Sequence, residues 1–460
     1  MKTKVWLSLL IISSLLFSAC ADTAPAASTV EMDSSIPLSQ DTLEMVPDFS
    51  YVVSPQKPHV FIDRMGYRTG DKKMAFFYGE NIENTFSVQE TATGKEVYSG
   101  KMHKVKDIDG KHLYVGDFTG LSTEGSYVLK HAALGDSYEF IVEDSIYEHE
   151  FLVLQRSARE YNYTNVSDLT YVLANLMFIQ EMFHVEEVDS RFIEEKIAML
   201  LNSQDVKSGA FFSEIFTEPV GVSETVAGKQ DTVLNSMGTI SLTTTAQMAG
   251  ILAQYSVLYM QENPIFASQC LTASQKAYQY MEKYKANTDT DAWYYAAVQL
   301  YRATGQFKYR NAIAEYDAVD PALYSNSVQG YTILADFIYL STPRGTDYVR
   351  CNALLDKYME KAQAISVSSS RENFYVLENI DAKSDKEILE DMIILGIVNH
   401  VLSGQEYAGI ERNYVHYLSG VNMETENYLF EKMAGSLTPE GMDIANISRL
   451  LIIFGNLSQE

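Results

Sequence analysis

The sequence predicts a β-sandwich followed by an all-α domain of helical hairpins packed side by side. Between residues 58 and 144, short runs of alternating apolar and polar residues are separated by turn signals. From Ile146 onward the apolar residues recur at helical spacing, and the helices follow one another with only short polar breaks. This succession is typical of helical hairpins and not of alternating strands and helices. A chain of 460 residues is long enough for two or three such domains.

Charge limits the classes of partner. The formal net charge is −26, which would repel the phosphates of nucleic acid and an anionic membrane surface. We therefore expect no nucleic-acid partner. A neutral polymer such as a glucan is compatible with this charge.

The first residues resemble the export signal of a bacterial lipoprotein. Lys2 and Lys4 precede the apolar run Val5–Phe17, which is too short to span a bilayer, and Cys20 ends a lipobox-like Phe-Ser-Ala-Cys. The resemblance implies cleavage after residue 19, a diacylglycerol anchor on Cys20 and a place at the bacterial cell surface, with residues 20–57 as a flexible tether. An ordinary signal peptide with a chance cysteine remains the alternative.

The strand region has its turns marked by glycine. Thr93-Gly94, Asp109-Gly110 and Glu124-Gly125 separate runs such as KMAFFY, HLYVGDF and SYEFIVED, and about seven strands fit between residues 58 and 144.

The helical region, residues 145–460, is clearest in Ser241–Tyr309. Apolar stripes there are separated by Asn263-Pro264, an N-cap followed by proline at the first helical position, and place Cys270 and Trp293 in the core. Cys270 and Cys351 are too few for a disulfide framework, and no metal-ligand spacing involves them. Further helices are expected at Asp168–Phe183, Ser190–Ser203, Gly330–Leu340, Asp347–Ser366, Lys386–Ser403 and Glu406–Ser419.

The sequences of several segments resemble those of glycoside hydrolase family 9, the cellulase family. They are HVFIDRMGYRTGDKKMAFF, NPIFASQCLTASQKAYQYM, WYYAAVQLYRATGQFKY and SDKEILEDMIILGIVNHVLSG, in the family's order. The resemblance implies an immunoglobulin-like β-sandwich preceding an (α/α)6 barrel, binding of β-glucan, and inverting hydrolysis by two carboxyl groups without metal or cofactor.

The resemblance assigns the catalytic base to Asp168. Asn165 stands at the position of the family's partner aspartate, and the family's Gly-Gly-Trp-Tyr approach is missing. An asparagine cannot act as a carboxylate, although it can hold a water molecule by hydrogen bonding. As an alternative, Ser167 or Asp168 would serve as the N-cap of the following helix.

The acid falls on Glu440, with Asn446 at the position of the family's following asparagine. Alternatively, Thr438 would be an N-cap with Pro439 and Glu440 in the first helical turn, a setting that favours the ionised carboxylate instead of the protonated acid. The segment Asn422–Ser436 contains neither the His nor the Arg with which the family holds its sugar.

Tryptophan for sugar stacking is scarce, because Trp293 is the one tryptophan left after removal of the signal. Tyrosines could substitute, and Tyr161, Tyr163, Tyr294 and Tyr295 are candidates near expected loop ends; they could equally fill the core.

Two functions follow as hypotheses. The first is a degenerate, surface-tethered relative that engages β-glucan with lost or reduced hydrolysis. The second is an active inverting endo-β-1,4-glucanase with Glu440 as acid and Asp168 as base.

Overall fold

The computed structural model describes most of the chain beyond the N-terminal segment. The described residues are 57–215, 238–284, 290–317, 330–343, 345, 347–370, 374, 380, 383–402, 406–434 and 441–459, and all belong to one compact unit, Gln56–Glu460.

The first part of the structure is an antiparallel β-sandwich. Its strands hydrogen-bond in the order β1-β2-β5-β4-β3-β6-β7. The turns at Gly94 and Gly110 have positive φ, as the predicted Thr-Gly and Asp-Gly signals require. The strands are β1 (Val60–Phe61), β2 (Met74–Gly79), β3 (Thr85–Glu90), β4 (Glu96–Ile108), β5 (Lys111–Asp117), β6 (Gly125–His131) and β7 (Gly135–Val142).

Strand β4 joins the two layers of the sandwich. Its first half pairs with β3 and its second half with β5, with register shifts at Val88/Gln89 and Lys104/Lys106 that let the long strand bend from one sheet into the other. The core between the layers is aromatic, with Phe77, Phe118 and Phe140 buried.

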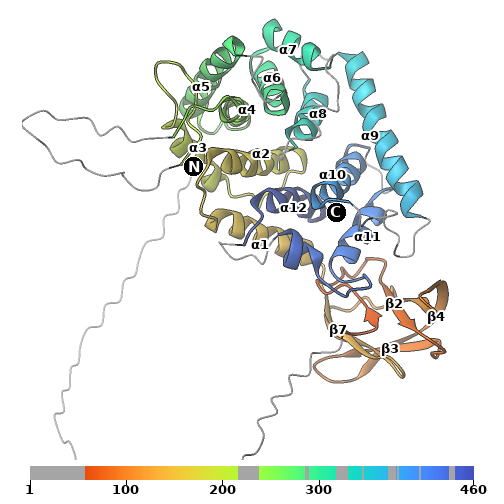
Figure 1. Cartoon of the computed structure of the whole chain (residues 1–460). Coiled ribbons are helices and arrows are strands. Elements are labelled where there is room, and N and C mark those ends of the chain that lie inside the picture. The colour runs from red at the N-terminus through yellow and green to blue at the C-terminus, as the bar shows by residue number, and fades with distance from the viewer. Residues whose placement is uncertain are drawn as a thin grey trace, which may run out of the picture. The chain divides into compact units, whose positions relative to one another are not determined.

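Twelve α-helices follow within the described residues (Figure 1). None of these helices is both long enough and apolar enough to cross a membrane. They are α1 (Ile146–Glu160), α2 (Val166–Met182), α3 (Ser190–Leu201), α4 (Leu242–Leu258), α5 (Pro264–Lys283), α6 (Thr290–Thr304), α7 (Phe307–Asp317), α8 (Tyr331–Ser341), α9 (Tyr348–Ser369), α10 (Asp385–Val401), α11 (Ala408–Leu418) and α12 (Ile444–Leu457), with a π-helical turn, η4 (Leu429–Met433), before the last.

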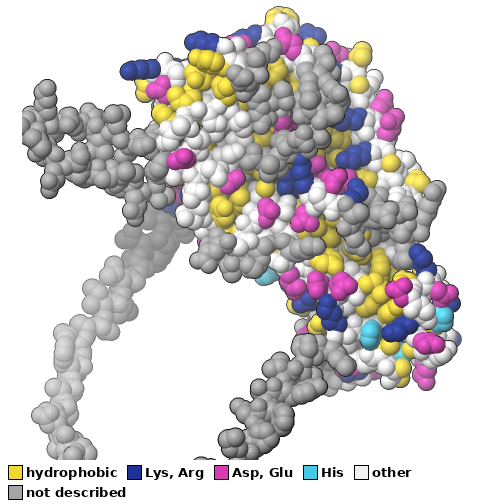
Figure 2. Space-filling model, viewed as in Figure 1, with side chains coloured by type: hydrophobic (Ala, Val, Ile, Leu, Met, Phe, Trp, Pro, Cys, Tyr) yellow, Lys and Arg dark blue, Asp and Glu magenta, His cyan; other side chains and the backbone are white. Residues whose placement is uncertain are grey.

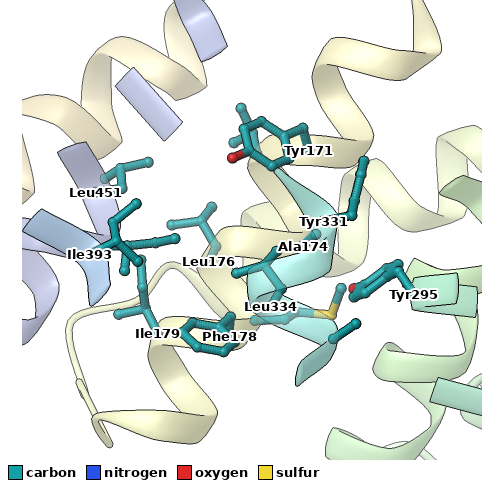
Figure 3. Packing of buried hydrophobic residues seen from close by; sticks show 14 of the residues in the cluster. Tyr171, Ala174, Leu176, Phe178, Ile179, Tyr295, Tyr331, Leu334, Ile393 and Leu451 are labelled. Atoms are coloured by element: carbon teal, nitrogen blue, oxygen red, sulfur yellow. The ribbon is translucent and has the colours of Figure 1, made fainter. Parts of the chain in front are cut away.

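The even-numbered helices form the inner layer. Helices α2, α4, α6 and α8 contact one another in succession, and α10 contacts α12, which contacts α2. The odd-numbered helices pack outside them, with α1 on α12, α5 on α4 and α9 on α8 and α10. Buried residues of α2, α6, α8, α10 and α12 fill the interior, among them Tyr171, Tyr295, Tyr331, Leu334 and Ile393 (Figure 3).

Local sequence signals account for several helix starts. Asn263 caps α5 and accepts a hydrogen bond from Phe266 N, with Pro264 at the first helical position, as predicted. Trp293 and Cys270 are buried, which confirms both as core residues. Cys270 and Cys351 are buried free thiols, so they do not pair.

A buried polar contact joins the sandwich to the helices. Asp63 accepts hydrogen bonds from the backbone N–H groups of Met65 and Gly66, and its Oδ2 lies 2.6 Å from Nδ1 of His416 on α11. Asp63 is fully buried, and the Tyr67 ring lies 4.9 Å from the His416 ring between centroids. Beside it, Arg412 Nη1 lies 3.1 Å from Asp71 Oδ1.

Candidate functional site

The candidate site lies where inner helices α2 and α12 begin. Asn165 caps α2 and Asp443 caps α12. The two helices pack together along their length, and Asn175 Nδ2 donates a 3.1 Å hydrogen bond to the Ser448 carbonyl. Burial raises the pKa of the Tyr161 hydroxyl, directly after α1, and the nearby charges of Asp168 and Asp443 add to the effect. The region that the sequence assigned to the base therefore adjoins the start of α12.

Asn165 and Asp168 are bonded to each other. Asn165 Oδ1 accepts a hydrogen bond from Asp168 N at 2.8 Å, and Asn165 Nδ2 donates to Asp168 Oδ2 at 2.6 Å. This arrangement resembles a capping box, in which the N-cap and the third helical residue satisfy each other. The N-cap is thus Asn165, so the alternative that placed it at Ser167 or Asp168 is wrong. Asp168 stays partly exposed at the helix start.

The two tyrosines before α2 differ in exposure. Tyr163 is 5% exposed, and its hydroxyl donates a 2.6 Å hydrogen bond to the Ala158 carbonyl at the end of α1. Burial is the main cause that raises the pKa of Tyr163, followed by the charge of Asp168. Tyr161 is partly exposed and packs edge-on against it, with ring centroids 4.9 Å apart. Of the pair, Tyr161 is the ring that a ligand could reach.

Asn446 lies in the first turn of α12 and is 5% exposed. Its Nδ2 donates to the Met433 carbonyl at 3.2 Å, and its Oδ1 accepts from Arg449 Nη1 at 3.0 Å. Arg449 is itself buried, 5.7 Å from the centre of the Tyr171 ring. Asn446 therefore ties α12 to η4 and orients a buried arginine behind the site.

Aromatic side chains close the barrel interior one turn below Asp168. The rings of Tyr171 on α2 and Tyr331 on α8 lie 5.3 Å apart, and Tyr295 on α6 lies 4.9 Å from Tyr331 (Figure 3). The Tyr331 hydroxyl is 3.2 Å from Thr170 Oγ1. This layer belongs to the core of the barrel next to the start of α2.

Extended backbone borders the start of α2. Asn165 pairs with Glu214 as an antiparallel bridge, Ile215 N donates to Thr164 O at 2.9 Å, and Ser213 N donates to Thr239 O at 3.0 Å. The chain on both sides of residues 216–237 is therefore held against the α2 start. Residues 216–237 themselves lie outside the described residues.

Several predicted site residues lie outside the described residues, namely Glu440, Thr438, Pro439 and Cys20. Helix α12 begins at Ile444 with Asp443 as its N-cap, so Thr438 does not cap it as the alternative had it.

Tyr294 and Tyr295 are fully buried in α6, so neither faces a loop end. The Tyr294 hydroxyl donates to Asp336 at 2.5 Å and Tyr295 bonds to Gln254. Both tyrosines therefore fill the core, as the alternative interpretation had it.

Sequence reasoning missed Asp443 and Arg449. The Asp-x-x-Asn spacing of an N-cap was a usable signal for Asp443, whereas an arginine among apolar residues gives no sign of its partner. Within the described residues, no cluster of three His, Cys, Asp or Glu side chains could hold a metal ion.

The structure is a β-sandwich followed by a domain of two layers of helices. Residues 219–438 match the family model described as glycosyl hydrolase family 9, and residues 55–136 match that of the cellulase N-terminal ig-like domain. The chain therefore carries a glycosyl hydrolase family 9 domain preceded by a cellulase-type immunoglobulin-like domain. The family 9 match spans neither Asp168 nor Glu440.

Solved structures share the fold, which confirms the predicted β-sandwich followed by an (α/α)6 barrel. A family 9 glycoside hydrolase from Bacteroides ovatus is 16% identical, with a TM-score of 0.67 over 87% of this chain and 99% of that one. A metagenome-derived family 9 endoglucanase is 16% identical, with a TM-score of 0.69 over the same shares. AaCel9A, solved in complex with cellobiose-like isofagomine, is 18% identical, with a TM-score of 0.62 over 80% of this chain and 83% of that one. Among curated proteins, none matches by sequence.

Proposed function

We propose that this protein is a surface-tethered family 9 relative that engages β-glucan with lost or reduced hydrolysis. The observation that carries the proposal is the Asn165–Asp168 pair. Inverting hydrolysis needs a base that holds and activates a water molecule. Where the family has two carboxylates, this chain has one, and both polar atoms of its asparagine partner are engaged with Asp168.

The surroundings of the pair support the same function. The segment Asn422–Ser436 has no His or Arg to hold a sugar at the cleavage point, and Trp293 is buried. Tyr163 and Asn446 are buried and hydrogen-bonded within the protein, which suits a supporting role. Tyr161 is left as the partly exposed ring for stacking a glucose unit.

Attachment to the membrane is part of the proposal and rests on the lipobox-like sequence at Cys20. A diacylglycerol anchor there would hold the folded unit at the bacterial surface through residues 21–56. Metabolic labelling of cells with an alkyne fatty acid should mark the wild-type protein and leave Cys20→Ser unmarked. An equally labelled Cys20→Ser protein would rule out the anchor.

The alternative function is an active inverting endo-β-1,4-glucanase, with Glu440 as acid and Asp168 as base. It is favoured by one observation: the partly exposed carboxylate of Asp168 lies near the start of α12, whose first residue, Ile444, follows Glu440 by four positions.

The experiment separates binding from cleavage. Purified protein is incubated with insoluble β-1,4-glucan, and bound protein and released soluble sugar are both measured. The proposed function predicts retention on the glucan with no sugar release above that of Asp168→Asn. Release that disappears in Asp168→Asn would establish the alternative, and failure to bind would exclude both. Tyr161→Ala should weaken retention, whereas Tyr138→Ala, an exposed tyrosine on β7, should not.

A further inference from the structure

The inner helices end together at the side of the barrel opposite Asp168, which lies in the first turn of α2. The Tyr259 hydroxyl, at the end of α4, donates a 2.5 Å hydrogen bond to Gln180 Oε1 near the end of α2. The Tyr301 hydroxyl, near the end of α6, donates a 3.1 Å hydrogen bond to the Gly345 carbonyl in the turn between α8 and α9. The turns that connect α4 to α5, α6 to α7 and α8 to α9 therefore lie at this same end.

Large apolar side chains protrude from these three turns. Ile265 in the first turn of α5 is 75% exposed, and Phe307 at the start of α7 is 74% exposed. Tyr348 and Val349 at the start of α9 are 78% and 81% exposed. Of the other large apolar side chains that the structure describes, Val206 alone is more exposed than these four. A single exposed apolar residue is ordinary, but four at one end of a barrel indicate a surface that contacts something apolar.

The charges that flank these side chains nearly balance. Lys308 and Arg310 follow Phe307 on α7, whereas Glu262 precedes α5 and Asp347 caps α9. Acidic and basic side chains also lie interspersed on the face of the molecule seen in Figure 2. Because charges act over only about a Debye length, roughly 8–10 Å in physiological salt, this end has no strong attraction for either sign of charge. Its affinity for a partner must come from the apolar side chains.

We propose that this end of the barrel rests on a lipid bilayer, with Ile265, Phe307, Tyr348 and Val349 inserted among the lipid head groups and the upper acyl chains. A second copy of the chain would need a contiguous apolar patch that fits matching hollows. Side chains that protrude from separate turns fit a fluid phase instead, which closes around each of them. The amphipathic ring of Tyr348 suits the boundary between head groups and acyl chains.

The proposed anchor on Cys20 would keep a bilayer within reach, and the inference rests on that part of the proposed function. A flexible chain of the length of residues 20–56 spans about 30 Å on average. Helix α4, with 17 residues, is about 26 Å long, so the tether would cover the depth of the barrel. With the α4–α5, α6–α7 and α8–α9 turns on the bilayer, Asp168 and Tyr161 face away from it, toward glucan outside the cell.

Flotation with vesicles of phosphatidylcholine, a lipid without net charge, tests the contact. The purified chain starts at residue 20 and carries Cys20→Ser, so it has no lipid anchor. We expect it to float with the vesicles equally well in about 0.1 M and about 0.5 M NaCl. Phe307→Ser/Val349→Ser in this chain should bind about tenfold more weakly or worse. Val206→Ser is the matched control and should bind like the parent chain, because Val206 is 94% exposed but its loop is hydrogen-bonded to the start of α4.

Fluorescence tests whether residue 307 itself enters the bilayer. Phe307→Trp should float like the parent chain, and its emission should be quenched by lipids brominated on their acyl chains. Val206→Trp should not be quenched, and the parent chain gives the background from the buried Trp293.

Four results would overturn the inference. They are no flotation of the parent chain, equal flotation of Phe307→Ser/Val349→Ser, flotation lost in high salt, and no quenching of Phe307→Trp. Sedimentation velocity should show a monomer; a dimer that Phe307→Ser/Val349→Ser dissociates would assign this end to a second copy and also overturn the inference. Because the chain in these tests carries no lipid and fatty-acid labelling tests Cys20 separately, failure of the contact and failure of the anchor are distinguished.

Discussion

At the scale of single residues, Asn165 decides what the start of α2 can do. Its side-chain oxygen accepts a hydrogen bond from a backbone N–H group at the helix start, and its amide nitrogen donates one to the Asp168 carboxylate. Where the family's pattern has a second aspartate, this chain therefore has an amide that stabilises the start of α2. The amide has hydrogen-bonding capacity left after these two bonds, but it cannot accept the proton that a base removes from water, and this is why we connect the pair with weak hydrolysis.

Replacement of Asn165 should separate capping from chemistry. Asn165→Ala removes the cap and should cost about 1 kcal/mol of unfolding free energy, within a range of about 0.5–2. Asn165→Ser keeps a good cap and should stay within about 0.5 kcal/mol of wild type. Chemical denaturation measures both, with the exposed Asn162→Ala as control. If Asn165→Ala were as stable as Asn162→Ala, the cap would not have the role assigned to it.

Glu150 should make stability depend on pH. Burial is the main cause that raises its pKa from 4.5 to about 7, with the nearby Asp63 charge adding to the effect. Between these values the folded state holds a proton that the unfolded state has lost, so stability falls as pH rises from 4.5 to 7.

Glu150→Gln removes this titration. At pH 4 position 150 is neutral in both folded proteins, so the difference in their unfolding free energies at this pH is the reference. By pH 8 the unfolding free energy of Glu150→Gln should have risen by about 1–3 kcal/mol relative to that of wild type. Thermal unfolding across this range measures the difference, with the exposed Glu148→Gln on the same helix as control. A constant difference between Glu150→Gln and wild type at all pH values would contradict the raised pKa.

At the scale of elements, the inner helices depend on small residues for close packing. Gly250 on α4 faces Tyr295 on α6, and a Cβ at Gly250 would lie 2.3 Å from the Tyr295 ring. Tyr295 in turn packs against Tyr331 of α8. The aromatic layer that follows Asp168 is therefore positioned in part by a glycine on the neighbouring helix α4.

Gly250→Ala should destabilise the protein despite the better helix propensity of alanine. Overpacking against the Tyr295 ring should cost about 1–3 kcal/mol. Gly409→Ala on α11, where a Cβ would meet nothing within 4 Å, is the matched control and should be neutral or stabilising by up to about 1 kcal/mol. Equal unfolding free energies for the two variants would mean that α4 and α6 can separate freely.

At the scale of the whole molecule, the sandwich and the barrel share a buried interface. The Asp63–His416 pair lies within it, and an apolar cluster combines Phe61, Phe76 and Val115 of the sandwich with Val421 after α11. A carboxylate that is fully buried at such a junction depends on its partner from the other domain.

His416→Ala should therefore cost about 3–5 kcal/mol, because it leaves Asp63 buried without its partner. We also expect unfolding to change from one transition to two as the domains lose their coupling. Calorimetry measures both effects, with His103→Ala on the exposed face of β4 as control. A single unshifted transition for His416→Ala would show that the pair does not couple the domains.

Sequence patterns predicted the fold well because periodicity and turn chemistry are local. Asn263-Pro264 and the Gly94 and Gly110 turns identified their elements without any tertiary information. The site was harder to predict, because the roles of its residues depend on contacts between distant segments. Asn446 and Arg449 are bonded to each other beside Tyr171, and no local pattern connects α12 with α2 in this way. Tyr294 and Tyr295 were placed near a loop end because they lie in the first two turns of α6 (Thr290–Thr304), but neighbouring helices bury them there.

The central claim is that the carboxylates of this barrel no longer cleave β-glucan efficiently. The most direct measurement is the rate of reducing-end release from a soluble β-1,4-glucan by wild type, Asp168→Asn and Glu440→Gln under identical conditions. We predict that the three rates agree within about twofold, since a lost side chain that was not catalytic changes no barrier. A wild-type rate that falls about a hundredfold or more in both variants would contradict the claim and establish an inverting glucanase.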